Sequence, residues 1–145
     1  MSPRLPLALA SLILAGCVSQ RSLPDAVGEV DFDAPSGKVG WAQYERTEFY
    51  PAVSAARFRG LAADALRQTR FEVLLDDPAS GCLKGEHGAT RFDWNVMAGV
   101  YYRQEKGGVR VRYIIEASKD IGIFGDKTDR DWISEIHGRI RVHLP

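Results

Sequence analysis

Apolar residues recur along the chain at two different spacings, which separate a helix from a series of strands. The helical stripe has members three or four positions apart: Ala55, Phe58, Leu61, Ala62, Ala65 and Leu66. This period predicts an amphipathic helix over 52–69, with Pro51 suited to its first turn, where a missing N–H costs little. Gly60 lies inside the predicted helix, and we expect it to mark a close approach of another backbone.

Alternating apolar and polar residues predict the strands. One strand is expected within 41–50, and further strands over 71–76, 82–87, 92–102 and 109–117. In the first of these four, Phe71, Val73 and Leu75 are expected on one face of the sheet. Turn-forming residues at 77–81 and 104–108 join neighbouring strands as hairpins, so the sheet is expected to be an antiparallel meander.

The C-terminal segment fits two structures. Trp132, Ile133, Ile136 and Ile140 have helical spacing and favour a closing helix. The alternative is a short helix ended by Gly138, followed by a terminal strand in which the apolar residues of 140–144 alternate. With the closing helix, the order is β-α-β-β-β-β-α. This order predicts an α+β two-layer sandwich in which two helices cover an antiparallel β-meander of four to five strands.

The N-terminus has the three parts of an export signal. A short positive region containing Arg4 precedes an apolar run over 5–15, and small residues follow. The run is about half of the ~20 residues that a membrane-spanning helix needs. We therefore expect residues 1–16 to be a cleaved signal peptide. The alternative is a plain secretory leader that happens to contain a cysteine.

The sequence Leu14-Ala15-Gly16-Cys17 resembles the lipobox of bacterial lipoproteins. The resemblance implies that a dedicated peptidase recognises Leu14, Ala15 and Gly16 and cuts before Cys17, whose thiol receives a diacylglycerol. Val18 stands where an Asp tends to retain such proteins at the inner membrane of didermal bacteria. The resemblance therefore implies an outer-membrane lipoprotein that faces the periplasm. The layout over residues 44–145 also resembles several small bacterial lipoproteins without assigned activity.

The chain after the signal divides into two parts. Residues 17–38 contain Pro, Gly and Ser without a sustained apolar period, which predicts a lipidated N-terminus followed by a flexible tether. Residues 39–145 are expected to form a single globular domain, which is a sufficient length to bury its own core.

Charge and cysteine content exclude several classes. The chain has 19 basic and 19 acidic side chains, and loss of Arg4 leaves a net charge of about −1. This balance gives no electrostatic basis for binding nucleic acid.

Once Cys17 is lipidated, Cys82 is the one remaining thiol, so a disulfide framework is excluded. We expect Cys82 to be buried and inert; pairing with another molecule is the alternative.

No catalytic or metal-binding pattern emerges from the remaining residues. The serines lack a Gly-x-Ser-x-Gly context, and Cys82 and His87 are expected on opposite faces of one strand. His87, His137 and His143 lack ligand spacing and are expected to be solvated or to cap helices. We therefore expect a protein that is not an enzyme and that uses no cofactor or metal.

The remaining candidate is a binding surface on the open face of the sheet. Its proposed members combine Tyr, Met and Arg, a composition typical of recognition patches: Asn95, Met97, Tyr101, Arg110 and Arg112. The sequence thus predicts a lipid-anchored binding or assembly accessory with an envelope protein as partner. The alternative is a periplasmic carrier that holds a small ligand or lipid between sheet and helices.

Overall fold

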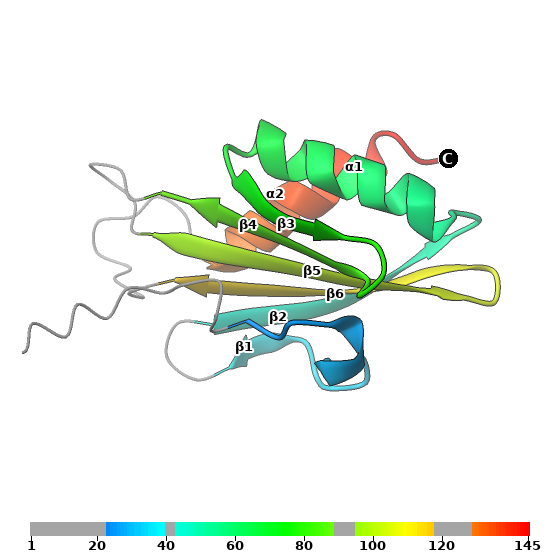
Figure 1. The fold of residues 1–145 in the computed structure, drawn as a ribbon, viewed down its shortest axis with the longest axis horizontal. Coiled ribbons are helices and arrows are strands. Elements are labelled where there is room, and N and C mark those ends of the chain that lie inside the picture. Colours follow the sequence, from blue (N-terminus) through cyan, green and yellow to red (C-terminus); the bar gives the residue numbers. More distant parts are fainter. Residues whose placement is uncertain (1–22, 40–42, 89–94, 118–128) are drawn as a thin grey trace, which may run out of the picture.

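The protein is a six-stranded antiparallel sheet with two helices packed on one face (Figure 1). The computed structural model describes residues 23–39, 43–88, 95–117 and 129–145. Its elements are β1 (Gly37–Val39), β2 (Gln43–Pro51), α1 (Ala55–Gln68), β3 (Glu72–Asp77), β4 (Cys82–His87), β5 (Val96–Glu105), β6 (Gly108–Ala117) and α2 (Asp129–Arg141).

The strands lie in the order β1-β2-β6-β5-β4-β3, and every neighbouring pair is antiparallel. The predicted turns at 77–81 and 104–108 join β3 to β4 and β5 to β6 as hairpins, and β4 pairs antiparallel with β5. The β5–β6 hairpin closes between Glu105 and Gly108, where Gly107 adopts a φ of +86° that favours glycine. Strand β2 pairs along its whole length with the last strand, β6, and β1 pairs with β2 at the edge of the sheet.

The predicted α+β two-layer class is confirmed, with one strand more than expected. The extra strand is β1, which consists of three residues at the edge of the sheet, two of them within the predicted tether. Helix α1 starts later than predicted. Pro51 ends β2, and the Ser54 hydroxyl caps the helix by accepting a hydrogen bond from the Arg57 amide.

One apolar core fills the space between the sheet and the helices. The alternating residues of β5 and β6 meet the buried faces of α1 and α2. The core also contains six aromatic side chains from the sheet, both helices and the segment between α1 and β3: Tyr50, Phe58, Phe71, Tyr102, Tyr113 and Trp132. The predicted helix stripe is confirmed, since Phe58, Ala62, Ala65 and Leu66 are buried. Burial of this cluster is the main driving force for the two-layer packing.

Strand β3 contains a bulge that changes which side chains face the core. Val73 pairs with Gly85, whereas Leu75 pairs with the adjacent Lys84, so Leu74 is the extra residue. Val73 therefore packs on the helix side, while Leu75 packs on the opposite face. The expectation that Phe71, Val73 and Leu75 share a face was wrong for Leu75, because one extra residue inverts the alternation.

Helix α2 continues through Gly138 to Arg141, so the preferred closing helix is confirmed and the terminal strand was wrong. Ile136 and Ile140 are fully buried against the core, which favours continuing the helix over exposing them on an edge strand. Among the described residues, neither helix is long and apolar enough to span a membrane.

The face of the sheet opposite the helices is covered by residues 23–36, which we call the N-terminal strap (Figure 1). The strap follows an irregular path: it contains one 3-10 turn, η2 (Val27–Glu29), a second turn at 32–33, and bends at 23, 25–26 and 34. Leu23 and Phe32 are each 3% exposed and pack with Cys82, Met97, Tyr101 and Ile114. The predicted flexible tether was therefore wrong from residue 23 onward; residues 17–22 lie outside the described residues.

Two helix glycines provide a test of the helices. A Cβ added at Gly60 or Gly138 meets no atom within 4 Å, so the expected close backbone approach at Gly60 was wrong. Gly60→Ala and Gly138→Ala should each raise the free energy of unfolding by about 0.5–1 kcal/mol, because alanine loses less backbone entropy. Gly107→Ala is the control and should lower it, because its φ is positive. Urea unfolding followed by circular dichroism measures all three.

Candidate functional site

The candidate binding residues lie on the face that the sequence indicates, but that face is not open. Met97, Tyr101 and Arg112 alternate away from the helices as predicted, yet each is fully buried beneath the strap. Arg110 is half-buried beside them, and Asn95 lies just before β5. The prediction of a solvent-exposed recognition patch was therefore wrong, because the protein's own N-terminal segment occupies it.

Arg112 is the centre of the contact between sheet and strap. Its guanidinium is 0% exposed and uses all five N–H groups. Nε and Nη2 donate to Glu45 Oε2, and Nη1 donates to Thr47 Oγ1 at 2.8 Å. The other two bonds reach the strap, at Ala34 O (2.8 Å) and Pro35 O (3.2 Å). A planar fork with five donors suits this task better than an ammonium group.

A second buried cation holds the start of the strap. Lys84, on β4, is 2% exposed, and its Nζ donates to Leu23 O at 3.2 Å and to Asp25 Oδ1 at 2.8 Å. The hydrogen bond and charge of Lys84 hold the pKa of the Asp25 carboxyl below its usual range. Next to it, the Tyr101 hydroxyl donates to Pro24 O at 2.7 Å. Sheet side chains thus bind strap backbone at both of its ends.

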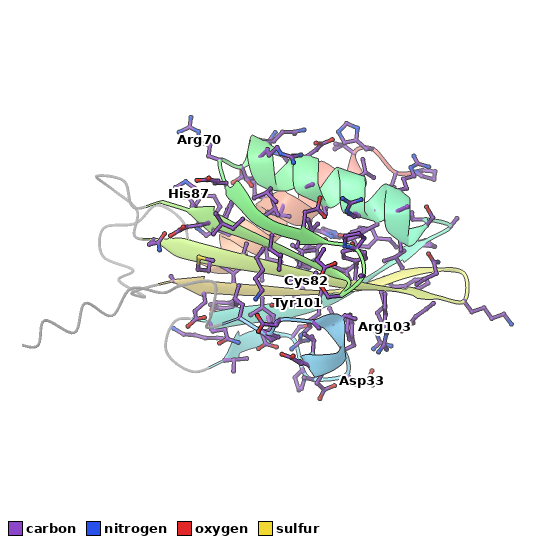
Figure 2. All side chains as sticks on the ribbon, viewed as in Figure 1. Asp33, Arg70, Cys82, His87, Tyr101 and Arg103 are labelled. Carbon is purple, nitrogen blue, oxygen red and sulfur yellow. The ribbon has the colours of Figure 1, made fainter. Side chains whose placement is uncertain are left out.

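Phe32 anchors the middle of the strap. Its ring is buried, and the Arg103 guanidinium lies 4.4 Å from the ring centroid. Arg110 donates to Phe32 O at 3.2 Å and to Asp33 Oδ1 at 2.6 Å, while the Thr47 hydroxyl donates to Phe32 O at 3.2 Å. Figure 2 shows Arg103 and Asp33 on the strap side of the sheet, with Cys82 and Tyr101 further inside.

Gly99, inside β5, is the sequence signal for this site that residue-type reasoning missed. A Cβ at this position would lie 2.6 Å from Cε2 and 2.9 Å from the hydroxyl of Tyr101. The absence of a side chain therefore lets the Tyr101 ring lie along the sheet, where its hydroxyl reaches the strap. A glycine inside an otherwise regular strand often marks such an approach.

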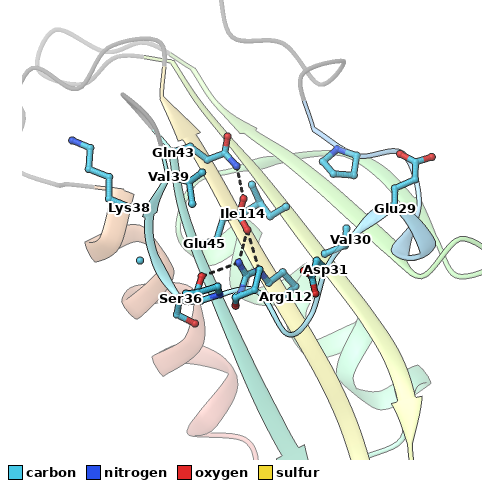
Figure 3. Close-up of a pocket in the computed structure, with 14 residues that line it drawn as sticks. Glu29, Val30, Asp31, Ser36, Lys38, Val39, Gln43, Glu45, Arg112 and Ile114 are labelled. Atoms are coloured by element: carbon cyan, nitrogen blue, oxygen red, sulfur yellow. Dashed lines mark hydrogen bonds and ion pairs between the residues drawn. The ribbon is translucent and has the colours of Figure 1, made fainter.

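An open cavity of about 610 Å³ adjoins the Arg112 cluster (Figure 3). It lies between the strap, β1 and the neighbouring strands β2 and β6. Its lining is mixed, with Val30, Val39 and Ile114 beside Glu29, Asp31 and Lys38. Because the Arg112–Glu45 pair at its base is neutral as a whole, the cavity has no single dominant charge. The cavity is therefore not a site for one charged ligand. It continues the strap-binding face, which is the sheet surface formed by Lys84, Met97, Tyr101, Arg110 and Arg112.

Cys82 lies under the strap and is fully buried, as predicted. Burial raises the pKa of its thiol to about 11, which keeps it protonated and unreactive at neutral pH. His87 faces the other layer, where its ring packs against Phe71 and Trp132. The expectation that these two side chains point to opposite faces of β4 is confirmed, so they do not form a catalytic pair.

Two histidines are less solvated than expected. His87 is buried among aromatic rings, and His137, on α2, is half-buried and contacts the sheet. His137 Nδ1 lies 2.7 Å from the Tyr50 hydroxyl, which in turn lies 2.5 Å from the Tyr113 hydroxyl. Burial raises the pKa of both tyrosines, so both hydroxyls keep their protons. The exposed His143 fits the original expectation.

The His137 contact predicts a pH dependence of stability. Burial, with smaller contributions from Arg46 and Arg141 against Glu48, holds the pKa of His137 below 6.5. The unfolded chain then binds more protons than the folded chain near pH 6, so the free energy of unfolding should fall as the pH drops below about 6.5. Urea unfolding at several pH values should show a smaller fall for His137→Gln than for the native protein. His143→Gln is the control and should leave the slope unchanged.

The described residues offer no obvious catalytic or metal centre. No group of three or more His, Cys, Asp or Glu side chains among them could hold a metal ion. The proposed lipidation and cleavage residues, Leu14, Ala15, Gly16 and Cys17, lie outside the described residues. We therefore take the strap-binding face as the candidate functional site, because its buried cations and Tyr101 make hydrogen bonds to another segment of chain.

Comparison with known proteins adds no assignment to this geometry. No protein-family model and no curated protein sequence matches this chain.

Proposed function

We propose that this protein is a lipid-anchored accessory of the bacterial envelope. Cys17 carries the lipid, and the α+β domain binds or helps assemble another envelope protein on the periplasmic side of the outer membrane. The anchor is supported by the Leu14-Ala15-Gly16-Cys17 sequence at the end of an apolar run. Two or three acyl chains on one residue are enough for stable attachment.

The observation that carries the binding role is the strap-binding face. One face of the sheet presents buried Arg112, Lys84 and Tyr101 to an irregular segment of chain. These side chains donate hydrogen bonds to its backbone carbonyls, so the contact does not depend on which side chains the bound segment carries at those positions. A small-ligand carrier would hold its ligand between the sheet and the helices. In the described part of the chain, core side chains fill that layer, so this observation favours the binding role.

The packed strap also changes the expected distance from the membrane. Leu23 is held on the sheet, so only residues 18–22 separate it from Cys17. At most about 20 Å of extended chain can span this interval, at ~3.3–3.6 Å per residue. In the proposed arrangement the domain works close to the bilayer surface, and its partner is within or beside that membrane.

The anchor is tested by labelling cells with a radioactive fatty acid. Cys17→Ala should abolish incorporation and leave unprocessed precursor, whereas Cys82→Ala should incorporate label as the native chain does. Label in the Cys17→Ala protein would contradict the lipobox assignment.

The binding role is tested by crosslinking in intact envelopes. One reproducible crosslinked envelope protein is expected, and its loss in Cys17→Ala would show that anchoring is required. Repeated recovery of the domain alone would contradict the role.

A further inference from the structure

The strap is held mainly through groups that any polypeptide segment possesses. Five of its backbone carbonyls accept hydrogen bonds from sheet side chains: those of Leu23, Pro24, Phe32, Ala34 and Pro35. The donors are three cations, one phenol and the hydroxyl of Thr47. Backbone carbonyls carry no sequence information, so a different segment can satisfy the same donors.

Selectivity for particular segments comes from two apolar anchors and two carboxylates. Leu23 and Phe32 fill the apolar positions, nine residues apart. Asp25 pairs with Lys84 and Asp33 pairs with Arg110, but their side chains are 86% and 81% exposed. Exposed ion pairs contribute little to stability, so these acids favour docking without fixing it permanently.

The composition of the face suits a surface that is intermittently solvated. Arg112 and Lys84 are almost completely buried, and burying charges is expensive compared with an apolar layer. When the strap leaves, water again solvates the two cations, and this offsets their desolvation penalty. The uncovered face would then present Tyr101, Met97 and several arginines, residue types that are enriched in protein interfaces.

We propose that this face is a binding site for an acidic segment of a partner protein, which replaces the strap and follows its irregular path. The segment would carry two apolar side chains about nine residues apart, with a carboxylate after each one. The proposal deepens the proposed function and rests on it, since it names the contact through which the envelope partner is bound. In the free protein, the strap is the intramolecular occupant of the same site.

Cys82 provides a direct readout because it is buried beneath the strap. The full chain is treated with iodoacetamide, and mass spectrometry follows alkylation of Cys82 separately from Cys17. The variant Leu23→Ala/Phe32→Ala should label about tenfold faster or more, because both anchors are lost. A synthetic peptide of residues 23–36 should then slow the labelling again, in a saturable way. The same peptide with alanine at both anchor positions is the matched control and should not.

Each result decides the proposal in one direction. Circular dichroism and urea unfolding establish that the variant is folded. If it fails to fold, Tyr101→Phe/Asp33→Asn replaces it, because that pair keeps every apolar anchor.

A folded variant whose Cys82 stays as protected as in the native chain, or is not protected by the peptide, would overturn the proposal. Protection that grows with protein concentration without peptide would identify a second copy's strap as occupant and overturn the partner assignment. These measurements use no membrane, so their failure leaves the Cys17 labelling result intact.

Discussion

Replacing Arg112 by alanine is expected to lower the free energy of unfolding by about 3–5 kcal/mol, among the largest losses from a single substitution in this protein. The substitution removes five hydrogen bonds at once and leaves the Glu45 carboxylate, whose side chain is 16% exposed, without its cation. It also leaves the carbonyls of Ala34 and Pro35 without donors. Urea unfolding followed by circular dichroism at neutral pH measures the loss.

Arg110→Ala is the matched control on the same strand. Arg110 also binds the strap, but its ion-pair partner Asp33 is largely exposed, so a loss of about 1 kcal/mol or less is expected. The double variant Arg112→Met/Glu45→Gln should recover part of the Arg112 loss, because no uncompensated buried charge remains. Equal losses for Arg112→Ala and Arg110→Ala would show that the Arg112 cluster is not buried in solution.

Phe58→Ala is expected to be comparably damaging, with a loss of about 3–5 kcal/mol. Phe58 is fully buried in the first turn of α1, and its ring packs against Tyr50 and Tyr102 at centroid distances of 5.0 and 5.7 Å. Removing the ring creates a cavity between the helix and the sheet, and the surrounding side chains can close it only in part. The midpoint and slope of urea unfolding separate this loss of stability from a change in the unfolded state.

Phe49→Ala provides the same chemical change at a position where it should cost much less. Phe49 is 45% exposed near the end of β2, on the face opposite the core. We expect a loss of about 1 kcal/mol or less, since most of the ring is already in contact with water. If Phe58→Ala proved no more damaging than Phe49→Ala, the assignment of α1 to the core would be wrong.

The regular part of the fold was accessible from local patterns. The spacing of Ala55 to Leu66 indicates α1, and alternation together with turn residues indicates β3 to β6 in the right order. Each of these signals arises within one element or one hairpin, so neighbouring residues contain it. The errors in this region were local as well: Pro51 belongs to β2, and the Leu74 bulge moves Leu75 to the other face.

The packing of the strap on the sheet could not be predicted from the sequence, for a different reason. Leu23, Val27 and Val30 have helical spacing, but the pattern stops at Phe32, and the Pro, Gly and Ser residues around it give the segment the composition of a linker. Its partners on the sheet lie 59 to 78 positions further along the chain in the contacts that Lys84, Arg110 and Arg112 make. No local pattern contains such contacts. Conversely, the prediction that Met97, Tyr101, Arg110 and Arg112 share the face of the sheet turned away from the helices is confirmed.

The sequence by itself therefore determined the two-layer class, most of the hairpins and which strand residues turn away from the helices, because apolar periodicity and turn chemistry are local properties. The sequence also contains Leu14-Ala15-Gly16-Cys17, on which the proposed lipid anchor rests. Only the tertiary structure decided what covers the second face of the sheet. That outcome depends on an irregular segment meeting buried Arg112, Lys84 and Tyr101 on remote strands, and on backbone carbonyls that every residue possesses and no sequence pattern reveals.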